Sequence, residues 1–286
     1  MSENSQLSPE SPAKLYIVAT PIGNIGDITY RAIETLQQVD LIAAEDTRHS
    51  GKLLSHYQIK KPMFALHDHN ERDRAKFLIE KIKSGQSIAL ISDAGTPLIN
   101  DPGYHLVNEC RNQVVDVVPI PGPSAVITAL SAAGLPTDRF SYEGFLPVKE
   151  KGKQDRLKSL IEETRTMIFY ESPRRIQDTV QQIINIFGPD KKLVIARELT
   201  KTFESFYSLP AGEMLDFLNT DSNHCRGEFV LIVAGAAKET ESIPQVALNT
   251  LALLKEQLPL KKAAALTAQI HDQKKNELYK WGLDNL

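Results

Sequence analysis

Residues 88–103 constrain the fold more than any other stretch, because an apolar run leads directly into a loop rich in Gly, Pro and Asp. The apolar run, residues 88–91, is typical of a parallel strand that is covered on both faces. Ser92 and Asp93 follow at the carboxyl end of this strand, where open α/β sheets bind their ligands. Gly95 allows the backbone to approach a ligand closely, since glycine has no Cβ. An ordinary β-to-α turn is the alternative, but such turns rarely need twelve residues.

The same order of apolar run, polar loop and helix-like segment recurs along the first half of the chain. Strands are predicted at residues 15–19, 41–45, 63–66, 88–91 and 114–118. Helices are predicted at residues 28–38, 51–57, 71–84, 104–111 and 125–133. Asp27 is expected to cap the first of these helices, and Asp101 the helix that follows Pro102. This order predicts an α/β fold in which a parallel sheet carries helices on both faces and its strand-end loops form a crevice.

A second half begins after Gly134 and Pro136, which interrupt the pattern. Its predicted strands lie at residues 140–145, 166–170, 192–196, 205–208 and 228–233, and its predicted helices at 155–161, 176–187 and 213–218. These strands are expected to be mixed in direction. Three further helices, at residues 247–258, 260–270 and 275–283, predict a helix-turn-helix-like bundle. The expected organisation is a disordered leader (1–13), an αβα domain (14–136), an α/β domain (137–237) and a helical appendage (238–286).

The charge balance limits where a polyanion could bind. With a net charge of −3 over 286 residues, the chain has no global basic field, so any nucleic-acid surface must be a local patch. Two segments qualify, residues 149–158 and the lysine-bearing tail. The alternative for residues 149–158 is a solvated surface loop, and the alternative for the tail is a small helical cap with a solvated face.

The two cysteines are far apart in sequence and form neither a metal pattern nor a disulfide framework, which agrees with a reducing cytoplasm. No apolar run approaches membrane-spanning length.

Common catalytic motifs are missing from the sequence. It contains no GxxxxGK[ST], no GxGxxG after the first strand and no GxSxG, which excludes P-loop, dinucleotide-binding and hydrolase-elbow signatures. His67 and His69 share one face of an extended segment, but no carboxylate-rich set with zinc-ligand spacing accompanies them, so no metal is expected. The residues alone therefore indicate a two-domain α/β enzyme with a small-molecule crevice.

Six motifs occur in an order that is typical of one family. They are TPIGNIGDITYRA, EDTR, FALHDHN, SDAGTPLINDPG, FYESPRR and ARELTKTFE, found between residues 20 and 204. The chain resembles the family of ribosomal RNA small subunit methyltransferase I, a branch of the tetrapyrrole-methylase superfamily. The resemblance implies two unlike αβα domains with S-adenosylmethionine in the cleft between them, usually in a homodimer. It also implies methylation of the ribose 2′-hydroxyl of a cytidine in the decoding region of 16S rRNA, in the free RNA or the small ribosomal subunit.

The resemblance also implies which residues contact the cofactor. They are Pro21, Ile22, Gly23, Ser92, Asp93, Ala94, Gly95, Thr96, Pro97, Ser124, Ala125, Tyr170, Leu199, Gly227 and Glu228. Tetrapyrrole methylases usually carry G-D-P and P-G-D elements where this chain has SDAGTP and IGD. Those departures argue against a porphyrin substrate.

A ribose 2′-hydroxyl is a poor nucleophile, so removal of its proton helps the reaction. The candidate bases are Asp46, His67, His69, Glu198 and Lys201, of which the lysine qualifies only if its pKa is depressed. The candidate RNA-binding residues are Arg48, Lys149, Lys151, Lys153, Arg156, Arg174, Arg175, Lys261, Lys262, Lys274 and Lys275. An ion pair within the protein is the alternative for each of them.

Two other functions stay open at this stage. One is a methylase that acts on a tetrapyrrole or a protein side chain, for which a basic tail is not needed. The other is a non-catalytic nucleic-acid-binding protein. The intact Gly/Pro loops at the strand ends argue against this second function. Calorimetric titration with S-adenosylmethionine separates the second from the methylases.

Overall fold

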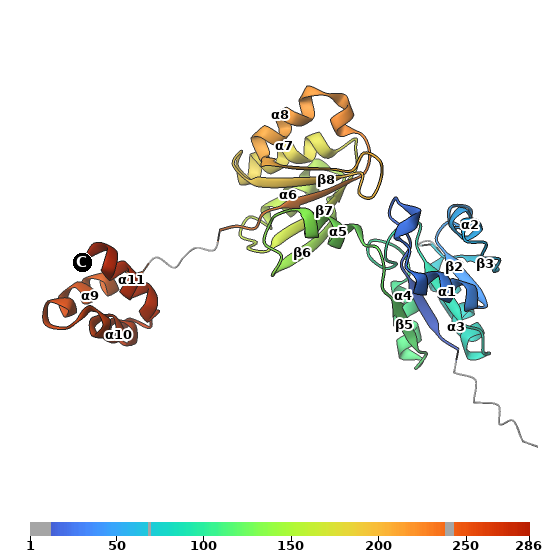
Figure 1. Cartoon of the computed structure of the whole chain (residues 1–286), viewed down its shortest axis with the longest axis horizontal. Helices are drawn as coiled ribbons and strands as arrows, with labels where there is room; N and C mark the ends of the chain where they lie inside the picture. Colours follow the sequence, from blue (N-terminus) through green and yellow to red (C-terminus); the bar gives the residue numbers. More distant parts are fainter. Residues whose placement is uncertain (1–12, 68–69, 238–242) are drawn as a thin grey trace, which may run out of the picture. The chain divides into compact units, whose positions relative to one another are not determined.

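The computed structural model describes residues 13–67, 70–237 and 243–286. The chain divides into two compact units, of which one ends at Ala236 and the other begins at Ala237 (Figure 1). The first unit contains two five-stranded sheets, and the described part of the second contains helices and no strand. Within the described ranges, no helix is long and apolar enough to cross a bilayer.

The first sheet is parallel throughout, as the sequence predicts, with the strand order β3-β2-β4-β1-β5. Its strands are β1 (Leu15–Val18), β2 (Leu41–Ala44), β3 (Met63–Ala65), β4 (Ile88–Ile91) and β5 (Val117–Ile120). Every residue of β2 and β4 is buried, which explains their uninterrupted apolar runs. The predicted start of β5 at Val114 is wrong, because Val114 has a positive φ of 58° and cannot continue an extended strand.

Helices cover both faces of the first sheet, as predicted. They are α1 (Tyr30–Gln38), α2 (Thr47–His56), α3 (Glu71–Lys83) and α4 (Tyr104–Asn112). Leu36 of α1 and Leu54 of α2 pack against one face of the sheet, in the same cluster as Ile42. Leu78 of α3 and Leu106 of α4 pack against the other face.

Two predicted helix caps are wrong. Asp27 ends a 3-10 turn, η1 (Ile25–Asp27), and the side chain of Thr29 caps α1 instead, because its hydroxyl accepts a hydrogen bond from the Ala32 N–H at 3.2 Å. Asp101 does not cap α4, which begins only at Tyr104 and has no side-chain cap.

The start of α2 also differs from the prediction. The helix begins at Thr47, four residues before the expected Gly51. Asp46 explains the early start, because its carboxylate accepts a 2.8 Å hydrogen bond from the backbone N–H of Arg48 at the helix N-terminus. The additional turn places more side chains of α2 at the carboxyl edge of the first sheet.

The second sheet has the order β6-β7-β10-β8-β9 and is mixed in direction, as predicted. Its strands are β6 (Phe140–Phe145), β7 (Thr166–Glu171), β8 (Lys192–Arg197), β9 (Ser205–Pro210) and β10 (Phe229–Val233). Strands β6 and β7 are parallel, and the remaining neighbours are antiparallel.

Helices also cover both faces of the second sheet, so each sheet forms the middle of an αβα sandwich. They are α5 (Ala125–Ala132), α6 (Glu150–Lys158), α7 (Ile176–Phe187) and α8 (Ala211–Thr220), with a short turn η2 (Ser222–Cys225) after the last. Helices α7 and α8 pack together on one side (Figure 1), and α5 covers the opposite face through Val126 and Leu130. Helix α5 follows β5 of the first sheet directly, so it connects the two sandwiches.

Residues 150–158 form helix α6, which begins five residues before the predicted helix at 155–161 and ends three residues before its predicted end. Lys153 is only 1% exposed, and its ammonium group pairs with Asp178 and donates a 3.1 Å hydrogen bond to the hydroxyl of Thr179. The assignment of Lys153 to an RNA-binding surface is therefore wrong, because this lysine joins α6 to α7 inside the protein.

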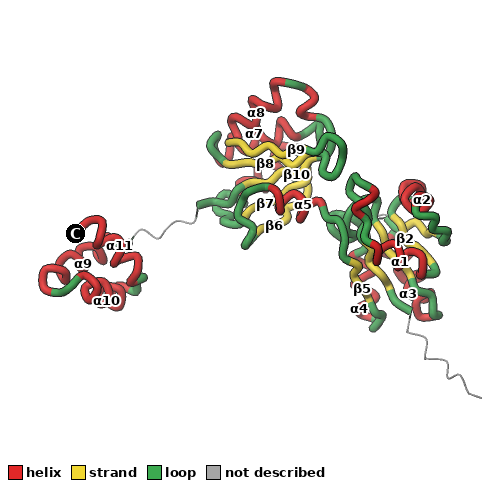
Figure 2. Tube along the Cα trace, in the orientation of Figure 1, coloured by secondary structure: helices red, strands yellow, loops and turns green. Residues whose placement is uncertain are grey.

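The second unit is a three-helix bundle, as predicted, in which short turns join the helices (Figure 2). Its helices are α9 (Gln245–Gln257), α10 (Leu260–His271) and α11 (Lys275–Asn285). A small core of Ala247, Leu251, Ala263, Ala264 and Leu278 holds them together. Lys261, Lys262, Lys274 and Lys275 are all exposed on this bundle.

Candidate active site

The loop after β4 is attached to the end of β1 by backbone hydrogen bonds. The N–H of Thr20 donates to the carbonyl of Gly95 at 2.8 Å, and the N–H of Gly95 donates back to Thr20 at 3.0 Å. The hydroxyl of Thr96 donates to the carbonyl of Pro123 at 2.9 Å, which adds the loop between β5 and α5. Three strand-end loops of the first sheet are therefore held at one edge.

Backbone strain is concentrated in two loops of the first unit. Leu98 and Asn100, after β4, have φ angles of 73° and 69°, and Glu198 and Thr200, after β8, have φ angles of 51° and 64°. Such conformations are unfavourable for residues with a side chain and persist only where the surrounding structure enforces them. Their grouping in two loops points to those loops as a functional site.

These two regions meet through the loop after β1. The backbone N–H of Asn24 donates a 2.9 Å hydrogen bond to the hydroxyl of Thr200. A Cβ on Gly23 would lie 2.8 Å from the carbonyl oxygen of Leu199, so only glycine allows this close approach of the two backbones. The contact fixes the edge of the first sheet against the loop of the second.

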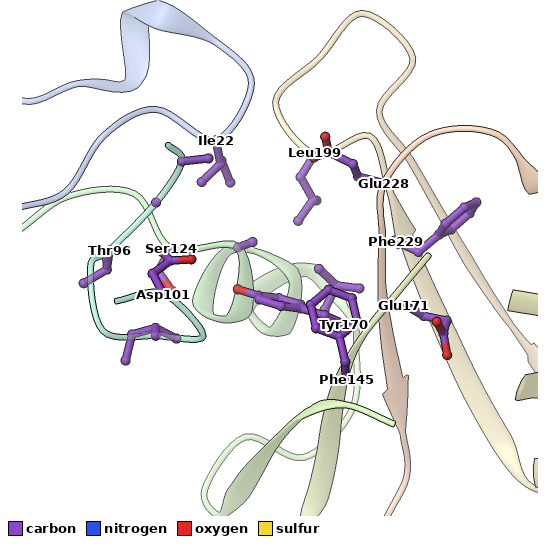
Figure 3. Close-up of a pocket in the computed structure, with 15 residues that line it drawn as sticks. Ile22, Thr96, Asp101, Ser124, Phe145, Tyr170, Glu171, Leu199, Glu228 and Phe229 are labelled. Atoms are coloured by element: carbon purple, nitrogen blue, oxygen red, sulfur yellow. The ribbon is translucent and has the colours of Figure 1, made fainter. Parts of the chain in front are cut away.

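A first cavity of about 220 Å³ lies between the two sheets (Figure 3). Ile22, Thr96, Asp101 and Ser124 form the wall on the side of the first sheet, and Phe145, Tyr170, Leu199, Glu228 and Phe229 form the facing wall. The Tyr170 ring reaches across the cavity toward Asp101 and Ser124 (Figure 3). Burial, and then the nearby charge of Asp101, raise the pKa of the Tyr170 phenol. The cavity therefore combines an apolar, aromatic wall with a small polar corner.

A second cavity of about 480 Å³ adjoins the first, because Ile22, Ala94 and Glu228 line both. Its remaining wall is more polar and includes Asp93 and Lys201. Helix α2 also contributes to it, with His49, Lys52 and His56 among the lining side chains. The two cavities together offer room for two ligands or for one ligand and the reacting part of another.

The structure brings most of the predicted cofactor residues together. Lining the first cavity are Ile22, Ala94, Gly95, Thr96, Ser124, Ala125, Tyr170, Leu199 and Glu228. Lining the second are Pro21, Gly23, Ser92 and Asp93. Pro97 and Gly227 line neither cavity, and Gly227 lies against the side chain of Glu198. Sequence reasoning missed Ile99, Asp101, Phe145, Glu171, Phe229 and Val230 in the first cavity.

Of the four candidate bases that the structure describes, only Lys201 lines either cavity. Burial tends to lower the pKa of Lys201, but hydrogen bonds to Glu198 and Glu228 outweigh that effect and raise it, so this lysine stays protonated. For Glu198, burial tends to raise the pKa, but hydrogen bonds from the Glu228 N–H and from Lys201 lower it. Neither group is tuned to remove a proton near neutral pH.

Asp46 and His67 line neither cavity. Asp46 serves as the cap of α2, and the hydrogen bonds of its carboxylate with the Arg48 side chain and backbone lower its pKa to about 2. A carboxylate with so low a pKa is a weak base. The backbone N–H of His67 donates to the side chain of Asn70, and the His67 ring contacts the same side chain at 3.1 Å. His69 lies outside the described residues.

The candidate RNA-binding arginines differ in how accessible they are. The side chain of Arg48 is 90% exposed, although it pairs with Asp46 at 3.1 Å, and Arg174 is exposed as well. Arg175 is directed into the protein, because it donates to the carbonyl of Leu146 at 2.7 Å. Arg156 pairs with Glu143. Lys149, which precedes α6, and Lys151, in the first turn of that helix, are both exposed.

No group of three or more His, Cys, Asp or Glu residues in the described ranges is arranged to hold a metal ion.

Comparison with known proteins agrees with this architecture. The family model "Tetrapyrrole (Corrin/Porphyrin) Methylases" matches residues 14–215, and "RsmI C-terminal HTH domain" matches residues 241–286. The chain is 58% identical to ribosomal RNA small subunit methyltransferase I of Escherichia coli, over 98% of both chains. It is 56% identical to the protein of the same name in Vibrio cholerae, over 100% of this chain and 99% of the other. The chain belongs to the ribosomal RNA small subunit methyltransferase I family.

Solved structures place this family member within a wider fold. Cobalt precorrin-4 methyltransferase matches it with a TM-score of 0.59 at 18% identity, over 80% of this chain and 98% of that chain. Diphthine synthase matches it with a TM-score of 0.58 at 14% identity, over 78% of this chain and 90% of that one. At such low identity the likeness concerns the fold alone, which confirms the tetrapyrrole-methylase architecture that the sequence predicts.

Proposed function

We propose that the protein transfers a methyl group from S-adenosylmethionine to the ribose 2′-hydroxyl of a cytidine in the decoding region of 16S rRNA. The observation that carries this proposal is the first cavity, where strand-end loops of both sheets converge and nine of the predicted cofactor residues lie. The name shared by its relatives supports ribosomal RNA of the small subunit as the substrate. Action in the cytoplasm, as a homodimer, is part of the same proposal.

The residues of the first cavity fit an adenosine-containing sulfonium cofactor. Phe145, Tyr170 and Phe229 offer aromatic surface to a purine ring. Asp101 and Glu228 bring negative charge to a cavity that would hold a cationic sulfur. When bound, S-adenosylmethionine supplies a methyl group that is already activated, so positioning of the acceptor contributes much of the rate.

We assign the proton-accepting role to the carboxylate of Asp101. The reason for this assignment is its position, because Asp101 lines the first cavity together with Thr96 and Ser124, two of the residues that the resemblance assigns to the cofactor. Asp101 stands beside Tyr170 at the polar corner, within the cavity that joins the two sheets. In this role its carboxylate oxygen would take the proton of the 2′-hydroxyl, while the methyl group would pass from the sulfonium sulfur to the ribose oxygen and leave S-adenosylhomocysteine.

We also propose the division of the first unit into residues 14–136 and 137–237. Each range contains one of the two sheets, which supports the division. Helix α5 lies in the first range and packs on the second sheet.

A methyl-transfer assay tests the function directly. Purified protein, labelled S-adenosylmethionine and unmodified 16S rRNA or small subunits are expected to give labelled 2′-O-methylcytidine after nuclease digestion. Label in a protein side chain or in an added tetrapyrrole, with none in the RNA, would favour the alternative of a methylase that acts on those substrates. Absence of any calorimetric binding of S-adenosylmethionine would favour a non-catalytic protein.

The helical bundle is expected to contribute RNA affinity and not cofactor affinity. Between residues 255 and 280 it carries six lysines against three acids, while the whole chain has a net charge of −3. Deletion of residues 240–286 should leave S-adenosylmethionine binding intact and weaken binding to RNA or subunits. Replacing Lys261, Lys262, Lys274 and Lys275 by Gln should flatten the salt dependence by roughly one unit per lost phosphate contact.

The control for this experiment is a variant with Lys60→Gln and Lys76→Gln. Both lysines are exposed, and both lie outside the bundle and outside the two cavities. If the four-lysine variant has the same RNA affinity and salt slope as this control, the bundle is a structural cap or a subunit contact.

A further inference from the structure

Helix α2 presents one polar face to the second cavity. His49, Lys52 and His56 line that cavity, and their spacing of three and then four residues places them on the same side of the helix. We call these three residues the α2 polar face. All three are exposed, so their polar atoms are accessible.

The end of α2 is fixed against the loop after β1. The hydroxyl of Tyr57, just beyond the helix, donates a 2.7 Å hydrogen bond to the carbonyl of Ile25, which also lines the second cavity. The ring of His56 packs edge-on against Tyr57, with 4.8 Å between ring centroids. The α2 polar face is therefore held in place relative to the loop after β1, in which Ile22 lines both cavities.

The cations of the second cavity are not equivalent. Lys201 is neutralised, because its ammonium lies 3.0 Å from Glu198 and 3.2 Å from Glu228. Lys52 forms no ion pair with any residue that the structure describes. An exposed lysine flanked by two imidazoles can bind an anionic oxygen without first breaking an ion pair.

Two serine hydroxyls in the wall of the second cavity add an independent observation. Ser50 and Ser92 are each 2% exposed, and neither hydroxyl has a hydrogen-bond partner within the described part of the chain. Buried hydroxyls in proteins are usually hydrogen-bonded, and an unsatisfied one at a cavity wall suggests that a ligand supplies the partner. Phosphate and ribose oxygens are suitable partners for both.

We propose that the second cavity holds the methyl-accepting nucleotide and that the α2 polar face binds the phosphodiester next to it. This inference rests on the proposed function, because it requires an RNA substrate. Lys52 contacts the phosphate, His49 and His56 donate hydrogen bonds to it, and the ribose then lies toward the shared boundary at Ile22, Ala94 and Glu228. The 2′-hydroxyl thereby reaches the first cavity, where Asp101 and the cofactor site lie.

Steady-state methyl transfer to RNA tests this inference. Lys52→Gln, and separately His49→Gln with His56→Gln, should raise KM for RNA about tenfold while kcat stays near that of the wild type. Calorimetric affinity for S-adenosylmethionine should not change. As for the bundle lysines, the salt dependence of RNA binding should fall by roughly one unit for each lost phosphate contact. Lys52→Arg keeps the positive charge and should retain most of the RNA affinity.

Lys60→Gln is the matched control, because Lys60 is exposed just after α2 and lines neither cavity. The inference is overturned if KM for RNA in the Lys52 and histidine variants equals that of Lys60→Gln. It is also overturned if those variants lose S-adenosylmethionine affinity, because the second cavity would then belong to the cofactor. Failure of the wild-type protein to methylate RNA at all would refute the proposed function together with this inference.

Discussion

The Gly95→Val protein is expected to fold but to lose S-adenosylmethionine binding. Gly95 has a φ of 79°, a conformation that β-branched residues rarely adopt. A Cβ at this position would lie 3.3 Å from Cγ2 of Ile22, a residue that lines both cavities. The additional branches of valine must therefore displace Ile22 or the loop into the first cavity. Such overpacking costs about 1–3 kcal/mol, which corresponds to a loss of affinity of up to about 10²-fold.

Gly85→Val separates backbone strain from loss of the site. Gly85 has a φ of 96°, nothing within 4 Å of its ideal Cβ, and a position after α3 that lines neither cavity. Both variants should lose about 1–3 kcal/mol of stability through backbone strain, and thermal unfolding measures that loss. Only Gly95→Val should lose cofactor affinity in calorimetry. If a folded Gly95→Val protein binds S-adenosylmethionine with wild-type affinity, the loop after β4 is not part of the cofactor site.

The Asp101→Asn protein is expected to bind S-adenosylmethionine and RNA almost normally but to turn over at least about 10² times more slowly. Asparagine keeps the shape of the side chain but cannot accept the 2′-hydroxyl proton as a carboxylate does. Single-turnover methyl transfer with saturating RNA measures this step apart from binding.

Asp116→Asn is the control, because the Asp116 side chain is 61% exposed and lines neither cavity. Equal turnover of the two variants would show that the Asp101 carboxylate does not remove the 2′-hydroxyl proton. A loss confined to cofactor affinity would instead assign Asp101 to binding. Replacing Glu198 or Lys201 offers a second comparison, since hydrogen bonding keeps the first ionised and the second protonated.

The sequence predicts the first sheet well because buried parallel strands leave a strong signal. Strands β2 and β4 are apolar at every position, and each is followed by a polar loop that must lie at the sheet edge. The loops of the cofactor site could be predicted for the same reason. The individual groups within those loops could not, since their positions depend on backbone turns that sequence patterns do not encode.

Asp101 illustrates that limit. An aspartate directly before a proline is typical of a helix N-terminus, but positive φ angles at Leu98, Asn100 and Gly103 turn the chain repeatedly and delay α4 to Tyr104. The carboxylate consequently lines the first cavity. The α2 polar face could be predicted only in part. Lys52 and His56 lie in the predicted helix at 51–57, but His49 lies in the first turn of α2, which is polar and carries no apolar periodicity.

Lys153 shows why charge alone does not predict a surface. In the sequence it belongs to a run of lysines, but its partner Asp178 is 25 positions away and lies on another helix. Only the packing of α6 on α7 reveals that this lysine is buried. The exposed charges nearby, Lys149 and Lys151, remain candidates for RNA contact.

A mass-spectrometric map of modified nucleotides in 16S rRNA tests the central claim most directly. Cells that lack the protein should be compared with the same cells carrying the wild-type or the Asp101→Asn gene. The account predicts that one 2′-O-methylated cytidine in the decoding region is absent without the protein, returns with the wild type, and does not return fully with Asp101→Asn. An identical 2′-O-methylation map of 16S rRNA with and without the protein would contradict it.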